Sequence, residues 1–183
     1  MLFLGAALNG HVDYFMKLLA RVPDVDVKRE IIQSSIKTEC NALMAASFSG
    51  HLDIVHILTN HGAAVDITNN QGVTALMNAS KNGHVKVMST LLERGASVDI
   101  ADTNGWTALM VASLHGHEKV VYALLDRVAS KDVTDKNGWT ALIVASDNGH
   151  DKVVSALLDR GASVDISIKS GFTALMLAGH NRS

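Results

Sequence analysis

The amino-acid sequence predicts an all-α solenoid, in which one unit of two short helices joined by a turn is stacked on itself. The first observation is an Ala-Leu pair that returns every 33 residues, beginning at Ala42, Ala75, Ala108, Ala141 and Ala174. The second is a Gly-His pair in step with it, at Gly50, Gly83, Gly116 and Gly149, with an earlier copy at Gly10 that a seven-residue insertion displaces. The third is an apolar content of 48%, which is compatible with burial along the whole chain.

The charge balance bears on the class of partner. The 183 residues include 16 basic and 18 acidic side chains, for a formal net charge of -2. So small a net charge gives no global field that would attract a nucleic acid backbone or an anionic membrane. No apolar run approaches the roughly 20 residues that span a bilayer. We therefore expect a protein or peptide partner, no nucleic acid and no membrane.

The N-terminal segment and the cysteine content indicate the compartment. Cys40 is the only cysteine, so no internal disulfide can form, which is typical of a reducing compartment. The opening MLFLGAAL has no basic residue before it and no cleavage pattern after it, so we interpret it as a helix of the first repeat and not as a signal peptide. We expect an intracellular protein, cytoplasmic or nuclear.

Each unit begins with a turn and a capped helix. Asn70-Gln71-Gly72 supplies turn-forming residues, and Thr74 follows where its hydroxyl can accept a hydrogen bond from the first turn of a helix. We expect this first helix to run from about Thr74 to Asn82. The same capping position recurs at Thr107, Thr140 and Thr173, and Asn41 replaces threonine in the earlier copy.

A second helix completes the unit. Gly83 can adopt the left-handed conformation that stops the first helix. The segment from His84 to Arg94 then carries Val87, Leu91 and Leu92 at the spacing of one apolar stripe. Gly62, Gly95 and Gly161 end these second helices, but Val128 occupies the place in one repeat. Either the loop differs there or a β-branched residue is strained in the left-handed region.

The string from Gly105 to Asp132, GWTALMVASLHGHEKVVYALLDRVASKD, resembles the ankyrin repeat of turn, two antiparallel helices and hairpin loop. The resemblance covers essentially the whole chain and implies an ankyrin-repeat solenoid of helix-turn-helix units joined by hairpin loops. By it, residues 1–183 form a single array. Its parts are a partial repeat with an insertion (1–33), full repeats (34–66, 67–99, 100–132 and 133–165) and a half repeat (166–183).

One departure from the family concerns its Thr-Pro-Leu-His signature. Ala75 and Met77, and the equivalent pairs Ala108 with Met110 and Ala141 with Ile143, stand where the family usually carries proline and histidine. The buried threonine-to-histidine network is therefore absent, and apolar packing must substitute. We interpret the methionines at one register of the first helix as core filling; they are Met44, Met77, Met110 and Met176.

Two regions depart from the regular period. The segment Arg21 to Glu39 contains the only proline. It is predicted to be a protruding loop that widens one end of a concave groove expected on the array. The half repeat lacks a second helix, so Leu175 and Leu177 would lack part of their cover. We expect either a fragment of a longer protein or a separate cap.

The regularly spaced histidines and aspartates are candidates for metal ligands or catalytic groups. Equivalent side chains of stacked repeats point in parallel, whereas a metal site or a catalytic site needs unlike groups that converge. We therefore interpret His51, His84, His117 and His150 as openings of second helices, and Asp66, Asp99 and Asp165 as polar groups of the hairpins. The sequence shows no glycine-rich phosphate loop and no paired cysteine motif. We predict no catalytic residue, no metal ligand, no cofactor and no enzymatic activity.

One register, directly before the capping threonine, carries large apolar residues that differ between repeats, and most of them are aromatic. Successive repeats carry Val73, Trp106, Trp139 and Phe172 there. The resemblance implies a position on the concave face beside the hairpin tips. Tryptophan is enriched at binding hot spots, so one interpretation is a recognition strip. The other is that each ring packs over its own hairpin, and both can hold.

Near-identical repeats also disagree at the end of the first helix. The segments Asn104 to Arg127 and Asn137 to Arg160 differ at Leu114/Asp147, at His115/Asn148 and at Tyr122/Ser155. The resemblance implies that the first two pairs, and Lys81 with Asn82 at the same register, face the groove; neutral drift is an alternative explanation. We predict a protein-protein interaction module that binds a peptide or protein surface in a concave groove. The alternative is a regulatory or scaffolding segment of a larger multidomain protein, such as a channel, a kinase or a ubiquitin-ligase subunit.

Overall fold

The computed structural model describes residues 2–21 and 41–180, and it divides into two compact units, residues 1–97 and 98–183. In these described segments every regular element is an α-helix, and the β-structure is one isolated bridge between Ser167 and Thr173. The insertion predicted to protrude and Cys40 lie outside the described residues, apart from Arg21, which ends the first segment.

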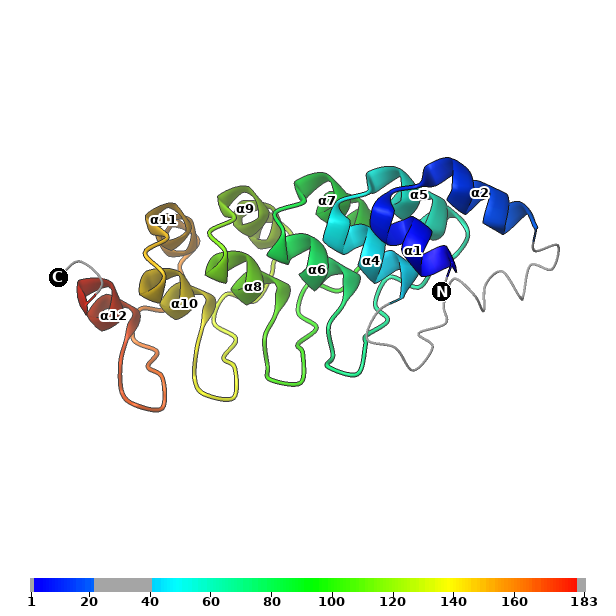
Figure 1. Ribbon diagram of the computed structural model, residues 1–183. Coiled ribbons are helices and arrows are strands. Elements are labelled where there is room, and N and C mark those ends of the chain that lie inside the picture. Colours follow the sequence, from blue (N-terminus) through cyan, green and yellow to red (C-terminus); the bar gives the residue numbers. More distant parts are fainter. Residues whose placement is uncertain (1, 22–40, 181–183) are drawn as a thin grey trace. The chain divides into compact units, whose positions relative to one another are not determined.

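Among its described residues, unit 1 contains three helix pairs. They are α1 (Leu2–Asn9) with α2 (Val12–Ala20), α4 (Ala42–Ser49) with α5 (Leu52–Asn60), and α6 (Ala75–Lys81) with α7 (Val85–Glu93). The first helices α1, α4 and α6 pack in one row, and the second helices α2, α5 and α7 pack in another (Figure 1). The opening apolar segment thus forms a helix of the first repeat, as predicted.

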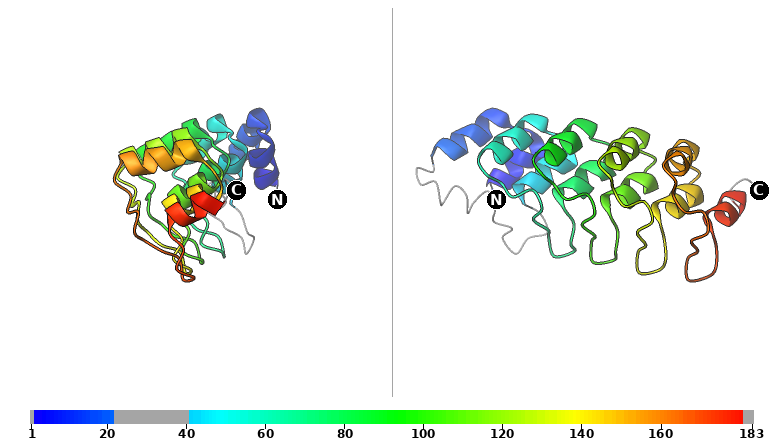
Figure 2. Two further views of the ribbon diagram at one scale, coloured as in Figure 1. Left: turned by 90° about the vertical axis from the view of Figure 1, so that its left-hand side faces the viewer. Right: turned by 180° about the vertical axis from the view of Figure 1, so that it is seen from behind.

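Over residues 98–180, unit 2 contains two helix pairs and a single helix. They are α8 (Ala108–Leu114) with α9 (Glu118–Asp126), α10 (Ala141–Asp147) with α11 (Asp151–Asp159), and α12 (Ala174–His180). The first helices α8, α10 and α12 again form one row and the second helices α9 and α11 another. In each unit the hairpin loops extend away from the helices (Figure 2). The predicted stack of helix-turn-helix units is confirmed within both units.

The predicted caps and stops are present. The side chain of Asn41 accepts a hydrogen bond from Met44 N at 2.8 Å, and Thr74 accepts one from Met77 N at 3.1 Å. Thr107 and Thr140 repeat this contact with residues 110 and 143. Because the hydroxyl or amide oxygen satisfies an amide that has no partner within the helix, the first helix begins at the residue after the cap.

The core lies between the two rows of helices. Met44, Met77, Met110 and Ile143 are all buried, so apolar packing does replace the family's histidine at this register. Met176 is 57% exposed, so its interpretation as core filling is wrong, because no second helix covers α12 among the described residues. The predicted loss of cover at Leu175 is confirmed, since this side chain is 82% exposed.

One loop carries backbone strain. Val128 has φ of 62°, the left-handed value that glycines adopt at the equivalent positions 62, 95 and 161. The side chain is 83% exposed, so no packing offsets the contact between its Cβ and the backbone. Of the two predicted alternatives, the structure therefore has the strained one.

Candidate binding surface

The hairpin of the first repeat in unit 2 holds Trp106 by its backbone. Asp102 Oδ1 accepts hydrogen bonds from the amide of Asn104 at 2.8 Å and from the amide of Trp106 at 2.9 Å. The Trp106 carbonyl in turn accepts from the Asp102 amide at 2.9 Å. A carboxylate that bonds two amides of its own turn fixes the turn geometry. The backbone from which the Trp106 side chain extends is therefore constrained.

The same turn recurs in the other hairpins. Asp135 Oδ1 accepts from the amides of Asn137 at 2.7 Å and Trp139 at 2.9 Å, and Asn69 does the same for residues 71 and 73. At Phe172 only backbone groups close the turn, through the bond from the Ile168 amide to the Phe172 carbonyl. These side-chain acceptors were not predicted, although their position four residues before Val73, Trp106 and Trp139 is visible in the sequence.

Successive hairpins in unit 2 are also joined to each other. The Lys136 amide donates to the Asn104 carbonyl at 3.0 Å, and the Lys169 amide donates to the Asn137 carbonyl at 2.9 Å. Each bond links one hairpin tip to the next repeat. The residues at the variable position are therefore held at fixed intervals within the unit.

The exposure of these side chains supports both interpretations of the strip. Trp106, Trp139 and Val73 are partly buried, and Phe172 is 44% exposed. Each tryptophan therefore packs in part against its surroundings and keeps an accessible portion. No ring contact joins the two indoles in the part of the chain that the structure describes.

The polar residues at the ends of the first helices have a structural role that was not predicted from the sequence. Each bonds the carbonyl four residues earlier: Asn82 Nδ2 to Asn78 O at 3.2 Å, His115 Nδ1 to Val111 O at 3.0 Å and Asn148 Nδ2 to Val144 O at 2.9 Å. The carbonyls of Val111 and Val144 also accept the backbone amides of residues 115 and 148, so the side chains of His115 and Asn148 add a second hydrogen bond at the ends of these helices. His115 and Asn148 nevertheless remain exposed.

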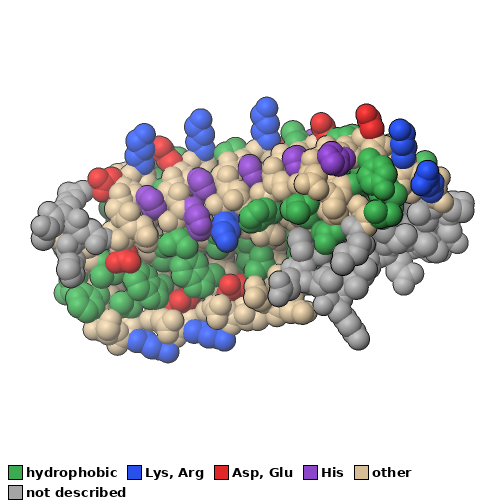
Figure 3. All heavy atoms as spheres, viewed as in Figure 1, with side chains coloured by type: hydrophobic (Ala, Val, Ile, Leu, Met, Phe, Trp, Pro, Cys, Tyr) green, Lys and Arg blue, Asp and Glu red, His purple; other side chains and the backbone are tan. Residues whose placement is uncertain are grey.

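The predicted site residues fall in both units. Val73, exposed Lys81 and Asn82 belong to unit 1. The remaining seven belong to unit 2, and we call this set the unit 2 surface: Trp106, Leu114, His115, Trp139, Asp147, Asn148 and Phe172. Within it, Leu114 and Asp147 are partly buried. Hydrophobic side chains gather in unit 2 between the first helices and the hairpin tips (Figure 3).

Comparison with known proteins agrees with this geometry. The family model described as ankyrin repeats (3 copies) matches residues 3–102, 43–135, 96–170 and 127–183, which together cover nearly the whole chain. The chain belongs to the ankyrin repeat family. No curated protein matches it. Ankyrin repeats are generally protein-protein interaction modules, and the family is typically not enzymatic.

None of the helices in residues 2–21 and 41–180 has the length and apolar character needed to cross a membrane.

Three of the periodic histidines of these ankyrin repeats each contact the preceding repeat within the same unit. The Nε2 atoms of His51, His84 and His150 lie 2.9–3.0 Å from the carbonyl oxygens of Leu8, Phe48 and Leu114. His84 and His150 also stand immediately before α7 and α11, so the prediction that the histidines open second helices is confirmed. Residues 2–21 and 41–180 contain no group of three metal-ligating side chains positioned to hold an ion.

The periodic aspartates connect the ankyrin hairpins. Asp66 accepts from the amide of Ser97 at 2.9 Å and from its hydroxyl at 2.6 Å, and Asp99 makes the same pair of bonds to Ser130. Asp132 accepts from the Ser163 amide at 2.8 Å. The interpretation of Asp66 and Asp99 as polar groups of the hairpins is confirmed. Their partner, a serine 31 residues later, was not predicted.

Proposed function

We propose that the protein binds another protein, or an extended peptide, through the unit 2 surface. The observation that carries this proposal is the pair Trp106 and Trp139. One indole stands in each repeat on the same hydrogen-bonded turn, keeps an accessible portion and makes no ring contact with the other in the described chain. Partly buried tryptophans on a fixed backbone are typical of interface anchors.

The arrangement favours recognition of a rigid-body kind. The turns around Asp102 and Asp135 hold the indoles in place before any partner arrives, so binding orders little of the protein itself. Ankyrin units that stack at about the 8–10 Å separation of packed helices leave the indoles farther apart than the roughly 7 Å of a ring contact. An apolar side chain of the partner fits between them.

The rest of the unit 2 surface supplies a polar margin. Phe172 extends the apolar strip toward α12, and Leu114 lies at the end of α8. His115 and Asn148 are exposed while their hydrogen bonds to the helix carbonyls hold them in position. An apolar centre with a polar rim is the usual anatomy of a protein interface.

Selection of peptides from a displayed random library tests this function. Purified wild-type protein is expected to enrich a consistent sequence pattern that includes an apolar or aromatic residue. The variant with both Trp106→Ala and Trp139→Ala is expected to lose this enrichment. Phe48→Ala, which removes an exposed aromatic side chain of unit 1, is the matched control and should select the same peptides as the wild type. Equal enrichment by the double tryptophan variant would refute the proposal.

A further inference from the structure

A serine stands at the same distance after an arginine at the ends of α7, α9 and α11. The pattern Arg-x-Ala-Ser occupies residues 94–97, 127–130 and 160–163. Protein kinases select substrates by the charge pattern around the acceptor hydroxyl, and arginine-directed serine kinases recognise an arginine three residues before the serine. The pattern therefore offers three acceptor hydroxyls of the same kind, those of Ser97, Ser130 and Ser163.

The three arginines differ in their contacts. Arg94 Nη2 donates a hydrogen bond to Asn60 Oδ1, and Arg160 Nη1 lies 2.7 Å from Asp126 Oδ1. Arg127 is exposed, and its side chain makes no hydrogen bond or ion pair within the part of the chain that the structure describes. A kinase that binds the Arg127 guanidinium therefore displaces no partner within the protein, whereas the other two arginines must first leave theirs.

The loop before Ser130 also opens at a lower cost than the other two. A kinase binds its substrate in an extended conformation, so the acceptor segment must open locally. Val128 holds φ of 62°, whereas glycines hold the left-handed position at Gly95 and Gly161. Extension of the segment releases the strain of the valine, and a glycine has no such strain to release. Ser130 is exposed and Val128 is 83% exposed, so the buried side chain that must move is the single methyl group of Ala129.

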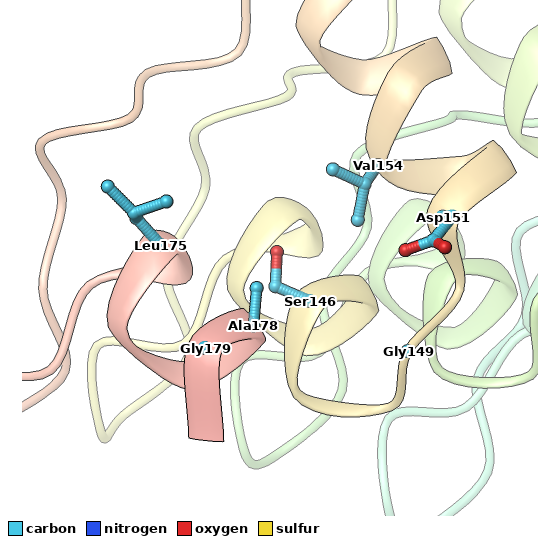
Figure 4. A pocket seen from close by; sticks show the side chains of 7 residues that line it. All are labelled: Ser146, Gly149, Asp151, Val154, Leu175, Ala178 and Gly179. Carbon is cyan, nitrogen blue, oxygen red and sulfur yellow. The ribbon is translucent and has the colours of Figure 1, made fainter. Parts of the chain in front are cut away.

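We propose that Ser130 is phosphorylated by an arginine-directed serine kinase and that the phosphoryl group breaks the contact of Ser130 with Asp99. Ser130 Oγ forms a bond to the γ-phosphorus of ATP while the bond from that phosphorus to the bridging oxygen breaks, and ADP leaves. The hydroxyl proton passes to the catalytic aspartate of the kinase. Ser130 does not belong to the unit 2 surface and does not line the open cleft of about 470 Å³ between α10, α11 and α12 (Figure 4). The modification is therefore independent of the proposed binding function.

The contact between Ser130 and Asp99 depends on the hydroxyl proton. Ser130 Oγ donates to Asp99 Oδ2 at 2.6 Å, and the Ser130 amide donates to Asp99 Oδ1 at 2.9 Å. Phosphorylation replaces that proton with a group of roughly −2 charge, which lies against the carboxylate and repels it. Both hydrogen bonds are then lost, and the link between these two successive hairpins opens.

Phosphorylation of the whole protein by the catalytic subunit of cyclic AMP-dependent protein kinase tests the proposal. Mass spectrometry of proteolytic fragments measures the initial rate at Ser97, Ser130 and Ser163. Each rate is divided by that of a free peptide with the same sequence (residues 91–101, 124–134 and 157–167), which removes the preference of the kinase for neighbouring residues. The ratio for Ser130 is expected to be at least about fivefold larger, the factor that corresponds to the strain of one left-handed valine. No phosphate on Ser130, or equal ratios at all three serines, would overturn the proposal.

Val128→Gly tests the role of strain without any risk of misfolding, because this variant is expected to be more stable than the wild type. Phosphorylation of Ser130 in the folded variant should be at least about fivefold slower. The free peptide with the same substitution is the matched control and should react as fast as the wild-type peptide. If the variant protein is modified as fast as the wild type, strain does not make Ser130 the preferred acceptor, and its assignment over the other two serines is wrong.

Urea denaturation measures the structural effect of the phosphoryl group. In a background with Ser97→Ala and Ser163→Ala, phosphorylation of Ser130 should lower the urea midpoint. The decrease should be smaller when Asp99→Asn is added, because asparagine keeps an acceptor but removes the charge that repels the phosphate. An unchanged or raised midpoint with Asp99 present would show that the phosphoryl group does not break this contact, and the proposed effect on the hairpins would be wrong.

Discussion

The imidazole of His150 occupies the space where Gly116 would carry a side chain. A Cβ built on Gly116 would lie 2.7 Å from Nδ1 of that ring, closer than non-bonded carbon and nitrogen atoms approach. The same relationship joins His51 to Gly10 and His84 to Gly50. Glycine at this register therefore serves two purposes, a left-handed helix stop and a seat for the histidine of the next repeat.

This dual role predicts unequal costs at two glycines of unit 2. Gly116 and Gly149 have similar φ values of 70° and 68°, but only Gly116 has a histidine ring above it. Gly149→Ala should lower the free energy of unfolding through backbone strain alone, by about 1–2 kcal/mol. Gly116→Ala should cost about 1 kcal/mol more, because the ring must move and lose its hydrogen bond. Urea denaturation measures both, and a His150→Ala background should remove the difference. Equal costs in the wild-type background would contradict the seat.

The strained loop predicts a stabilising substitution. Val128→Gly should raise the free energy of unfolding by about 0.5–1 kcal/mol, because glycine adopts φ near 62° without contact between Cβ and the backbone. The urea midpoint measures the change. Gly161→Val, at φ of 73° in the next repeat, is the reciprocal control and should lower the midpoint. An unchanged or lowered midpoint for Val128→Gly would show that the valine is not strained.

The hairpin ladder predicts different effects for two exposed aspartates. Asp99→Ala removes the acceptor of the amide and hydroxyl of Ser130 and should lower the free energy of unfolding by about 0.5–1.5 kcal/mol. Asp165 holds the same register and is also exposed, but no later hairpin serine lies within the described residues to pair with it. Asp165→Ala should therefore change the urea midpoint very little. If both substitutions have the same effect, the contact with Ser130 contributes nothing.

Burial predicts opposite results for two methionines of one register. Met110 is buried in the core of unit 2, so Met110→Ala should lower the free energy of unfolding by about 2–5 kcal/mol. Met176 is mostly exposed on α12, so Met176→Ala should shift the urea midpoint by much less. A large loss at Met176 would mean that this side chain is covered in solution.

Features set by local chemistry could be predicted from the sequence. The 33-residue period, the threonine caps and the glycine stops each depend on residues within one turn, so the pattern places the helices to within one residue, as α6 and α7 show. The position of Val128 among glycines predicted its strain for the same reason. The family resemblance placed the variable aromatic residues at the hairpins.

Contacts between repeats could not be predicted in the same way. The seat of His150 on Gly116 and the pairing of Asp99 with Ser130 depend on how far one repeat is displaced from the next, which the period alone does not determine. The helix-capping roles of His115 and Asn148 were missed because variation at this register suggested recognition first.

The dissociation constant of a library-selected peptide for the Trp139→Ala variant tests the proposed function most directly. Isothermal titration calorimetry compares wild type, Trp139→Ala and the control Phe48→Ala, while urea denaturation reports the folded fraction of each. Truncation of an anchor residue costs at least about 2 kcal/mol of binding, so Trp139→Ala should weaken affinity roughly thirtyfold while Phe48→Ala leaves it unchanged. If Trp139→Ala destabilises the protein but its folded molecules bind the peptide as tightly as the wild type, the indole only packs over its hairpin, and the unit 2 surface is not the binding site.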